Sequence, residues 1–126
     1  MRMKVARVSL DGETAVGERT LRKEVQMPFS GKPYSFSWPV VNSVYEVGAV
    51  YGLFQYSLAT AKYHCLYVGQ TDNLRRRLAE HLNNPPVAGS THFFAEAYAS
   101  EMQRKARETA LIAEFQPVGN TQGRRW

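Results

Sequence analysis

The sequence of 126 residues has only one cysteine, Cys65, and no long hydrophobic run. A single cysteine excludes a disulfide within the chain and a zinc site built from several cysteines. Because Cys65 lies in an apolar stretch, we expect it to be a small core residue. No apolar run approaches the roughly 18 residues of a membrane span, and the first residues lack the apolar core of a secretory signal. We therefore expect a cytoplasmic protein that does not cross a membrane.

Repeats and low-complexity tracts are also absent, and the length and composition are typical of one globular domain. The net charge is +5, and basic residues are concentrated in the run Arg75–Arg77 and in the final pair Arg124–Arg125. A basic surface of this kind favours an anionic partner, nucleic acid above all. The alternative is a solvated helix face, because arginine is also a good helix former.

The first third of the chain has a β-type pattern. Residues 3–10 alternate polar and apolar side chains, and Asp11-Gly12 is a tight-turn signal, so we expect a hairpin over residues 3–19 that residues 20–27 can extend. Residues 27–39 are rich in proline, glycine, serine and aromatic residues, which is typical of irregular or edge structure. We therefore divide the chain into a β-rich extension over residues 1–44 and a compact domain over residues 45–126.

Two short strand-like runs, one around Tyr51 and one around Tyr67, flank a polar and alanine-rich stretch near Ala59. A hairpin that turns about Ala59 would place the two tyrosines directly opposite each other. Their Cβ atoms would then lie roughly 5 Å apart on one face of the sheet. Two phenols side by side indicate a functional site.

A helix is expected after the second strand, because Asn73 and the residues just before it are good N-caps. We predict this helix over residues 73–82. Its buried stripe would consist of residues spaced four apart, Leu74, Leu78 and Leu82. Arg77 and His81 have the same spacing on a neighbouring stripe, so both can border the sheet.

A third strand is predicted over residues 91–97, and Ser100 with Gln103 resembles a capping box that opens a helix over residues 101–115. The apolar side of this helix would consist of Ala106, Ala110, Leu111 and Phe115. Pro117 would end it, leaving a short tail. The expected fold class is α+β, with a small three-stranded antiparallel sheet flanked by helices.

Ala49-Val50-Tyr51 and Tyr67-Val68-Gly69 resemble the two tripeptides that give the GIY-YIG nuclease superfamily its name. The closest spacing is that of the nuclease domain that opens the bacterial excision-repair incision protein. In that family an arginine follows the second tyrosine by ten positions and a histidine or tyrosine follows four later. A glutamate then precedes a proline by nine positions and an asparagine by twelve. The matching residues in this sequence are Arg77, His81, Glu108, Pro117 and Asn120.

The resemblance covers residues 45–121 and departs from the family pattern at two positions. Ala49 replaces the first glycine, and Gln70 stands where many relatives have a lysine. The resemblance implies a GIY-YIG endonuclease that cuts DNA by direct attack of water. The implied catalytic residues are Tyr51, Tyr67, Arg77, His81, Glu108 and Asn120. We expect nucleic-acid contacts at Gly69, Gln70, Arg75, Arg76 and Arg77.

The chemistry of these residues agrees with the resemblance. Glu108 is the only carboxylate of the set, so it would hold a single Mg²⁺ or Mn²⁺ together with waters and substrate phosphate. Arg77 can donate two parallel hydrogen bonds to the scissile phosphate. A tyrosine of pKa about 10 needs a fall of roughly 3 units to act as a base at neutral pH. His81 already has a reference pKa near 6.5, so either a tyrosine or His81 can be the base.

Two other functions stay open from the sequence. One is a catalytically silent module of the same fold that binds nucleic acid or docks a partner, and the other is an RNA nuclease. The sequence does not fix the oligomeric state, although a homodimer would suit the cutting of both DNA strands.

Overall fold

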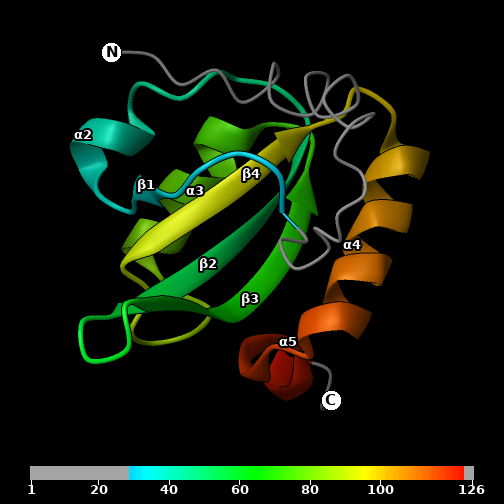
Figure 1. Cartoon of the computed structure of the whole chain (residues 1–126). Helices are drawn as coiled ribbons and strands as arrows, with labels where there is room; N and C mark the ends of the chain where they lie inside the picture. The colour runs from blue at the N-terminus through cyan, green and yellow to red at the C-terminus, as the bar shows by residue number, and fades with distance from the viewer. Residues whose placement is uncertain (1–28, 124–126) are drawn as a thin grey trace.

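A computed structural model describes residues 29–123, with side chains up to residue 120 (Figure 1). The predicted hairpin over residues 3–19 and its extension to residue 27 lie outside the described residues. The elements in chain order are β1 (Tyr34–Ser35), α2 (Trp38–Val41), β2 (Ala49–Ser57), β3 (Lys62–Thr71), α3 (Leu74–Asn83), β4 (His92–Ala97), α4 (Glu101–Phe115) and α5 (Val118–Gly123). No helix in this part of the chain is long and apolar enough to cross a membrane.

The fold class is α+β, as predicted, but the described sheet has four strands and not three. All strand pairs are antiparallel, and the order is β1-β4-β2-β3. The additional strand is short: Tyr34 pairs with Phe93 and Ser35 with His92. Its residues come from the proline-rich stretch expected to be irregular, where Tyr34 packs beside the ring of Phe93. A two-residue strand of this kind carries too little periodicity to be recognised in the sequence.

The predicted register of the central hairpin is wrong. Tyr51 pairs with Gly69, and Tyr67 pairs with Leu53. The turn is centred slightly after Ala59, and a β-bulge after Leu53 shifts the register further along the strands. The two tyrosines are therefore diagonal neighbours on one face, with ring centroids 6.3 Å apart. A diagonal pair still places both phenols on the same side of the sheet.

The sheet has a hydrophobic core on each face because alternate residues of a strand point to opposite sides. Helices α2 and α3 cover one face, and α4 covers the other beside β3 (Figure 1). Residues 29–44 contribute Phe29 to the core under α4 and Val41 and Val44 to the core under α2 and α3. Cys65 packs partly buried against the α4 core, as expected, and burial raises the pKa of its thiol to about 12.

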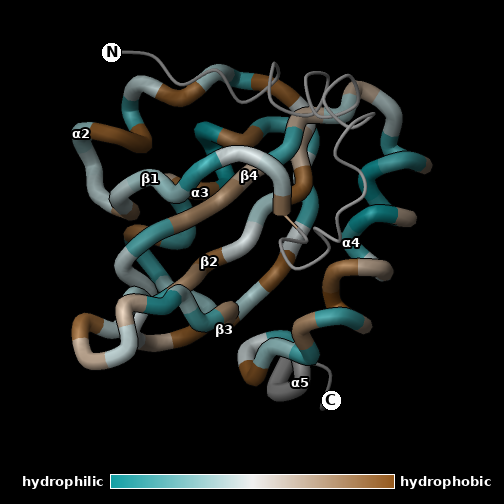
Figure 2. Tube along the Cα trace, viewed as in Figure 1, coloured by the Kyte–Doolittle hydropathy of each residue, from teal (hydrophilic) through white to brown (hydrophobic). Residues whose placement is uncertain are grey.

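The two long helices begin as the sequence predicts. The side chain of Asn73 accepts a hydrogen bond from the backbone of Arg76 at the start of α3, and Ser100 accepts one from Gln103 at the start of α4. Helix α4 has the predicted bounds, and most of its hydrophobic residues lie in its second half (Figure 2).

The predicted apolar side of α4 is partly wrong, because Ala106 and Ala110 are exposed. Leu111 is buried against the sheet. Arg104, which precedes Leu111 by two helical turns and lies on the same side of the helix, is buried as well. The sequence pattern failed here because the inner face of α4 carries charged residues in its first half. After Pro117 the chain forms α5, where the sequence predicted only a tail.

Candidate active site

Three aromatic rings from three elements meet on the face of the sheet covered by α3. Tyr51 of β2 is buried, and its hydroxyl lies 2.7 Å from Nε2 of His81 on α3. The ring of Tyr67 on β3 packs edge-on against His81, with centroids 5.6 Å apart. The sequence spacing therefore corresponds to a real cluster of two phenols and one imidazole.

Gly69 makes room for this cluster. A Cβ atom at this position would lie 2.5 Å from the hydroxyl of Tyr51 and 2.8 Å from its Cζ. Real Cβ atoms do not approach so closely, so any other residue would displace the phenol. Tyr51 and Gly69 are direct partners in the β2–β3 strand pair. The glycine of the second tripeptide therefore leaves the space that the tyrosine of the first tripeptide occupies.

Both phenols are harder to ionise than free tyrosine. Burial raises the pKa of Tyr51 well above its usual value, and the charge of Glu108 adds to the effect while Arg77 opposes it. Burial also raises the pKa of Tyr67, again with Glu108 adding and Arg77 opposing. Arg77 therefore acts in the direction that the sequence predicted, but burial outweighs it. The protein groups alone keep both phenols protonated at neutral pH.

His81 is neutral at physiological pH. Burial and, to a smaller extent, the charge of Arg77 lower the pKa of its imidazole to about 4, against the opposing charge of Glu80. With its proton on Nδ1, a neutral ring accepts a hydrogen bond at Nε2. The protonated phenol of Tyr51 is the donor in that arrangement. The pair is therefore a short path along which one proton can move.

Arg77 brings unused hydrogen-bond donors to this cluster. Its Nε atom is buried and has no acceptor among the described residues, while Nη1 lies 3.4 Å from a carboxylate oxygen of Glu80. A buried donor without an acceptor costs free energy, so it marks a place where a ligand or water completes the bonding. The charge of Arg77 acts on both phenols and on His81, which places the guanidinium close to all three.

Glu108 approaches the same cluster from α4. Its charge raises the pKa of Tyr51 and of Tyr67, so the carboxylate acts electrostatically on both phenols. Burial raises the pKa of Glu108 itself, and Lys105 opposes that shift. The carboxylate of α4 is thus within electrostatic range of the phenols on β2 and β3.

Asn120 does not present its amide to the cluster. Its Oδ1 accepts a hydrogen bond of 2.7 Å from the backbone N–H of Val68, and its Nδ2 donates one of 2.8 Å to the carbonyl of the same residue. Both ends of the amide are therefore used to hold α5 against β3, an edge strand of the described sheet. Asn120 is a positioning residue in this arrangement.

The residues predicted to contact nucleic acid are largely engaged within the protein. Arg75 donates to the carbonyl of Val44 and forms an ion pair of 2.9 Å with Glu46. Arg76 forms an ion pair of 2.8 Å with Asp72. The side chain of Gln70 accepts a hydrogen bond from Arg104. Of the three consecutive arginines, only Arg77 is turned to the aromatic cluster.

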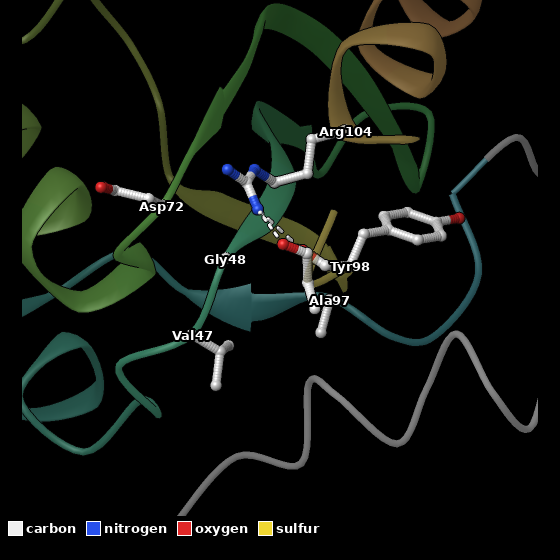
Figure 3. Close-up of a pocket in the computed structure, with 7 residues that line it drawn as sticks. Val47, Gly48, Asp72, Ala97, Tyr98 and Arg104 are labelled. Carbon is white, nitrogen blue, oxygen red and sulfur yellow. Dashed lines mark hydrogen bonds between the residues drawn. The ribbon is translucent and has the colours of Figure 1, made fainter. Parts of the chain in front are cut away.

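Arg104 is the residue that the sequence reasoning missed. It is 7 % exposed, and it donates to Gln70 and to the carbonyls of Tyr98 and Ala99 (Figure 3). The available signal was its spacing, since Arg104 lies four residues before Glu108 and thus on the same face of α4. An arginine in a helix is ordinarily solvated, which is why the spacing alone did not single it out.

The donor set fits a magnesium ion held through one protein carboxylate. Among the described residues there is no group of three or more histidine, cysteine, aspartate or glutamate side chains that would form an all-protein cage. Mg²⁺ commonly binds one or two carboxylates and takes its remaining ligands from water and substrate phosphates. Glu108 supplies one such carboxylate, and its charge acts on the two phenols.

Comparison of the chain with protein-family models, with curated proteins and with solved structures found no match.

Proposed function

We propose that this protein is a metal-dependent endonuclease of the GIY-YIG type, which hydrolyses DNA phosphodiester bonds by direct attack of water. The observation that carries the proposal is the cluster of Tyr51, Tyr67 and His81, with the charges of Arg77 and Glu108 acting on both phenols. The sheet with its flanking helices is compatible with the fold of that superfamily. The single free thiol fits a reducing, cytoplasmic setting.

Arg77 binds the scissile phosphate in this proposal. Its guanidinium has a buried Nε without an acceptor among the described residues, and a planar fork of donors suits two phosphate oxygens. Negative charge accumulates on those oxygens as water attacks. Donors that are already in place before the reaction stabilise that charge without further reorganisation.

The Tyr51–His81 pair accepts the proton of the attacking water. The water proton passes to the Tyr51 hydroxyl oxygen as the Tyr51 proton passes to Nε2 of His81, so the phenol never carries a full negative charge. The short hydrogen bond between the two side chains supports this relay. A bound phosphate offsets the charge of Arg77, which otherwise lowers the pKa of His81. Tyr67 orients the water beside the pair.

Glu108 would hold Mg²⁺ or Mn²⁺, and the bound ion supplies positive charge at the phosphate and the leaving oxygen. Asn120 supports this arrangement indirectly, by fixing α5 and the edge of β3 next to Tyr67.

A panel of DNA substrates tests the proposal. Single-stranded, duplex, flap and branched DNA are incubated with the protein and Mg²⁺ or Mn²⁺, with and without a chelator. We expect cleavage of at least one substrate, abolished by the chelator. A folded protein that cuts none of them with either metal contradicts the proposal. A parallel RNA panel separates the RNA-nuclease alternative.

The second candidate is a module that binds nucleic acid without cutting it. The raised pKa values of both phenols favour it, because they make the tyrosines poor bases on their own. Salt-sensitive binding of the same DNA panel, with no product under any metal, would support this candidate.

A further inference from the structure

Three open hollows adjoin one another through shared lining residues, from α3 past the end of β3 to the start of α4. The inner hollow, about 440 Å³, is lined by Arg77, Glu80, His81, Asn83 and Asn84. The middle hollow, about 230 Å³, is lined by Gln70, Thr71, Asp72, Arg77, Glu101 and Arg104. The outer hollow, about 550 Å³ (Figure 3), lies next to it and is lined mainly by apolar groups. Arg77 joins the inner and middle hollows, and Arg104 joins the middle and outer ones.

Arg104 is a buried cation without a carboxylate partner among the described residues. Its three acceptors are neutral: the amide of Gln70 and the carbonyls of Tyr98 and Ala99. The remaining group, Nη2, has no acceptor in the described part of the chain. In Figure 3 one terminal nitrogen of Arg104 bonds toward Tyr98, and the other points toward Asp72. An incompletely paired guanidinium in a nearly buried position is a binding group for an anion.

The other groups around the middle hollow do not neutralise this charge. Arg77 brings the second incompletely paired guanidinium, with its buried Nε. The two carboxylates of the rim are paired elsewhere, Asp72 with Arg76 at 2.8 Å and Glu101 with Lys105 at 3.2 Å. The N-terminal end of α4, which carries a partial positive charge, also borders the hollow. Two cations with spare donors therefore face one polar hollow.

The outer hollow differs in character from the middle one. Val47, Ala97 and Ala99 line it with apolar groups, and Arg104 forms the boundary with the middle hollow. An apolar surface next to an anion site matches the chemistry of a nucleotide, which joins an uncharged sugar and base to a phosphate. A polar hollow and an apolar hollow thus lie next to each other, as the phosphate and the nucleoside do in a nucleic-acid strand.

We propose that Arg104 binds the backbone phosphate next to the scissile one, so that a single DNA strand lies along the three hollows. Arg77 binds the scissile phosphate, Arg104 binds its neighbour, and the outer hollow receives the attached sugar or base. This inference rests on the proposed function for the identity of the scissile position. Gln70 fixes the guanidinium of Arg104 and is a positioning residue.

Binding of a labelled single-stranded DNA and of the matching duplex tests the inference. The measurements use Glu108→Gln protein, which prevents turnover, and compare it with the same protein carrying Arg104→Gln, Arg104→Lys or Lys62→Gln. Lys62 lies at the far end of β3 and provides a control with the same loss of charge. We expect Arg104→Gln to weaken binding about 10-fold and to reduce the salt slope by about one phosphate contact. Arg104→Lys should restore the slope, and Lys62→Gln should change neither quantity.

A matched pair of exposed acids provides a test that does not disturb the core. Asp72→Asn removes a negative charge from the rim, and Glu114→Gln removes one from the distal end of α4. We expect Asp72→Asn to tighten binding more than Glu114→Gln does. Equal effects of Asp72→Asn and Glu114→Gln on binding would overturn the inference. This comparison remains a test if circular dichroism shows that Arg104→Gln does not fold.

The outcomes separate the inference from the proposed function. If wild type cuts DNA while Arg104→Gln binds with unchanged affinity and salt slope, the inference is wrong and the nuclease proposal stands. If Arg104→Gln loses binding while wild type cuts nothing, Arg104 is a phosphate contact and the nuclease proposal is wrong.

Discussion

Two polar clusters lie on opposite faces of the same sheet and differ in how completely their hydrogen bonds are made. On the α4 face, Glu96 is 1 % exposed, and its carboxylate accepts hydrogen bonds from the backbone and hydroxyl of Ser30, from the hydroxyl of Tyr98 and from Arg107. Each carboxylate oxygen has at least two donors. Such a cluster holds elements together and offers nothing to a ligand.

The cluster on the α3 face is paired much less completely. Arg77 has a buried donor without an acceptor among the described residues, and both phenols have raised pKa values. Unmet hydrogen-bonding capacity in a native protein is costly, so it indicates a group that a ligand completes. The contrast predicts that mutations on the two faces separate stability from activity.

Glu96→Gln should have the largest effect on stability. The substitution leaves Arg107 beside an uncharged amide, and breaking a buried ion pair costs about 3–5 kcal/mol. The free energy of unfolding, measured by denaturant titration, checks this. Glu46→Gln is the control, because Glu46 pairs with Arg75 at the exposed surface, where such a pair contributes less than about 1 kcal/mol. Equal losses in the two variants would contradict the account of Glu96.

His81 should make stability depend on pH. Its pKa is about 4 in the folded protein, below the reference value of 6.5, so the unfolded chain binds a proton first as the pH falls. The contribution is complete above pH 6.5 and is lost as the pH falls to about 4, an amount of roughly 3 kcal/mol at most. Unfolding titrations at several pH values test this. His81→Gln should flatten the pH dependence in that window, and an unchanged profile would contradict it.

Gly69→Ala should destabilise the protein by about 1–3 kcal/mol, as expected for overpacking, because the new Cβ meets the Tyr51 hydroxyl. Cleavage should fall with it, since the phenol is displaced from His81. A double-mutant cycle with Tyr51→Phe checks the cause. Removing the hydroxyl relieves part of the clash, so Gly69→Ala should cost less stability in the Tyr51→Phe background; additive costs would refute this explanation.

Arg77→Met should have the smallest effect on stability, within about 1 kcal/mol of wild type, because the substitution removes a donor that has no acceptor among the described residues. Cleavage should nevertheless be lost. Arg75→Met is the matched comparison, because the guanidinium of Arg75 already donates hydrogen bonds to Val44 and Glu46. It should lose more stability and retain cleavage. The reverse ranking in thermal melts and cleavage assays would show that the two arginines have been assigned the wrong roles.

The sequence predicted the elements well where periodicity and caps are strong. Asn73 and Ser100 mark the starts of α3 and α4 because their side chains cap the first turn. The hairpin register was not predictable from the index sum alone, since a bulge and a displaced turn changed it. β1 was not predicted because two residues are too few to show the polar–apolar alternation of a strand.

The candidate site was predicted as a set of residues, but their roles needed coordinates. Spacing cannot show that Asn120 has both ends of its amide bonded to Val68. It also cannot show that Arg104 is buried without a carboxylate partner in the described part of the chain, because that depends on which groups of β3 and β4 lie beside α4. Burial, which determines the pKa of both phenols, is likewise a property of the packed fold.

The most direct test of the central claim compares two glutamates of the same helix. Glu108→Gln and Glu114→Gln change the charge equally, but the charge of Glu108 acts on both phenols, while Glu114 is exposed. Cleavage rates with Mg²⁺ are measured for both variants and wild type after their folding has been matched by circular dichroism. We predict that Glu108→Gln lowers the rate at least about 100-fold, as loss of a catalytic metal ligand should, and that Glu114→Gln retains it. Equal rates for the two variants would contradict the account.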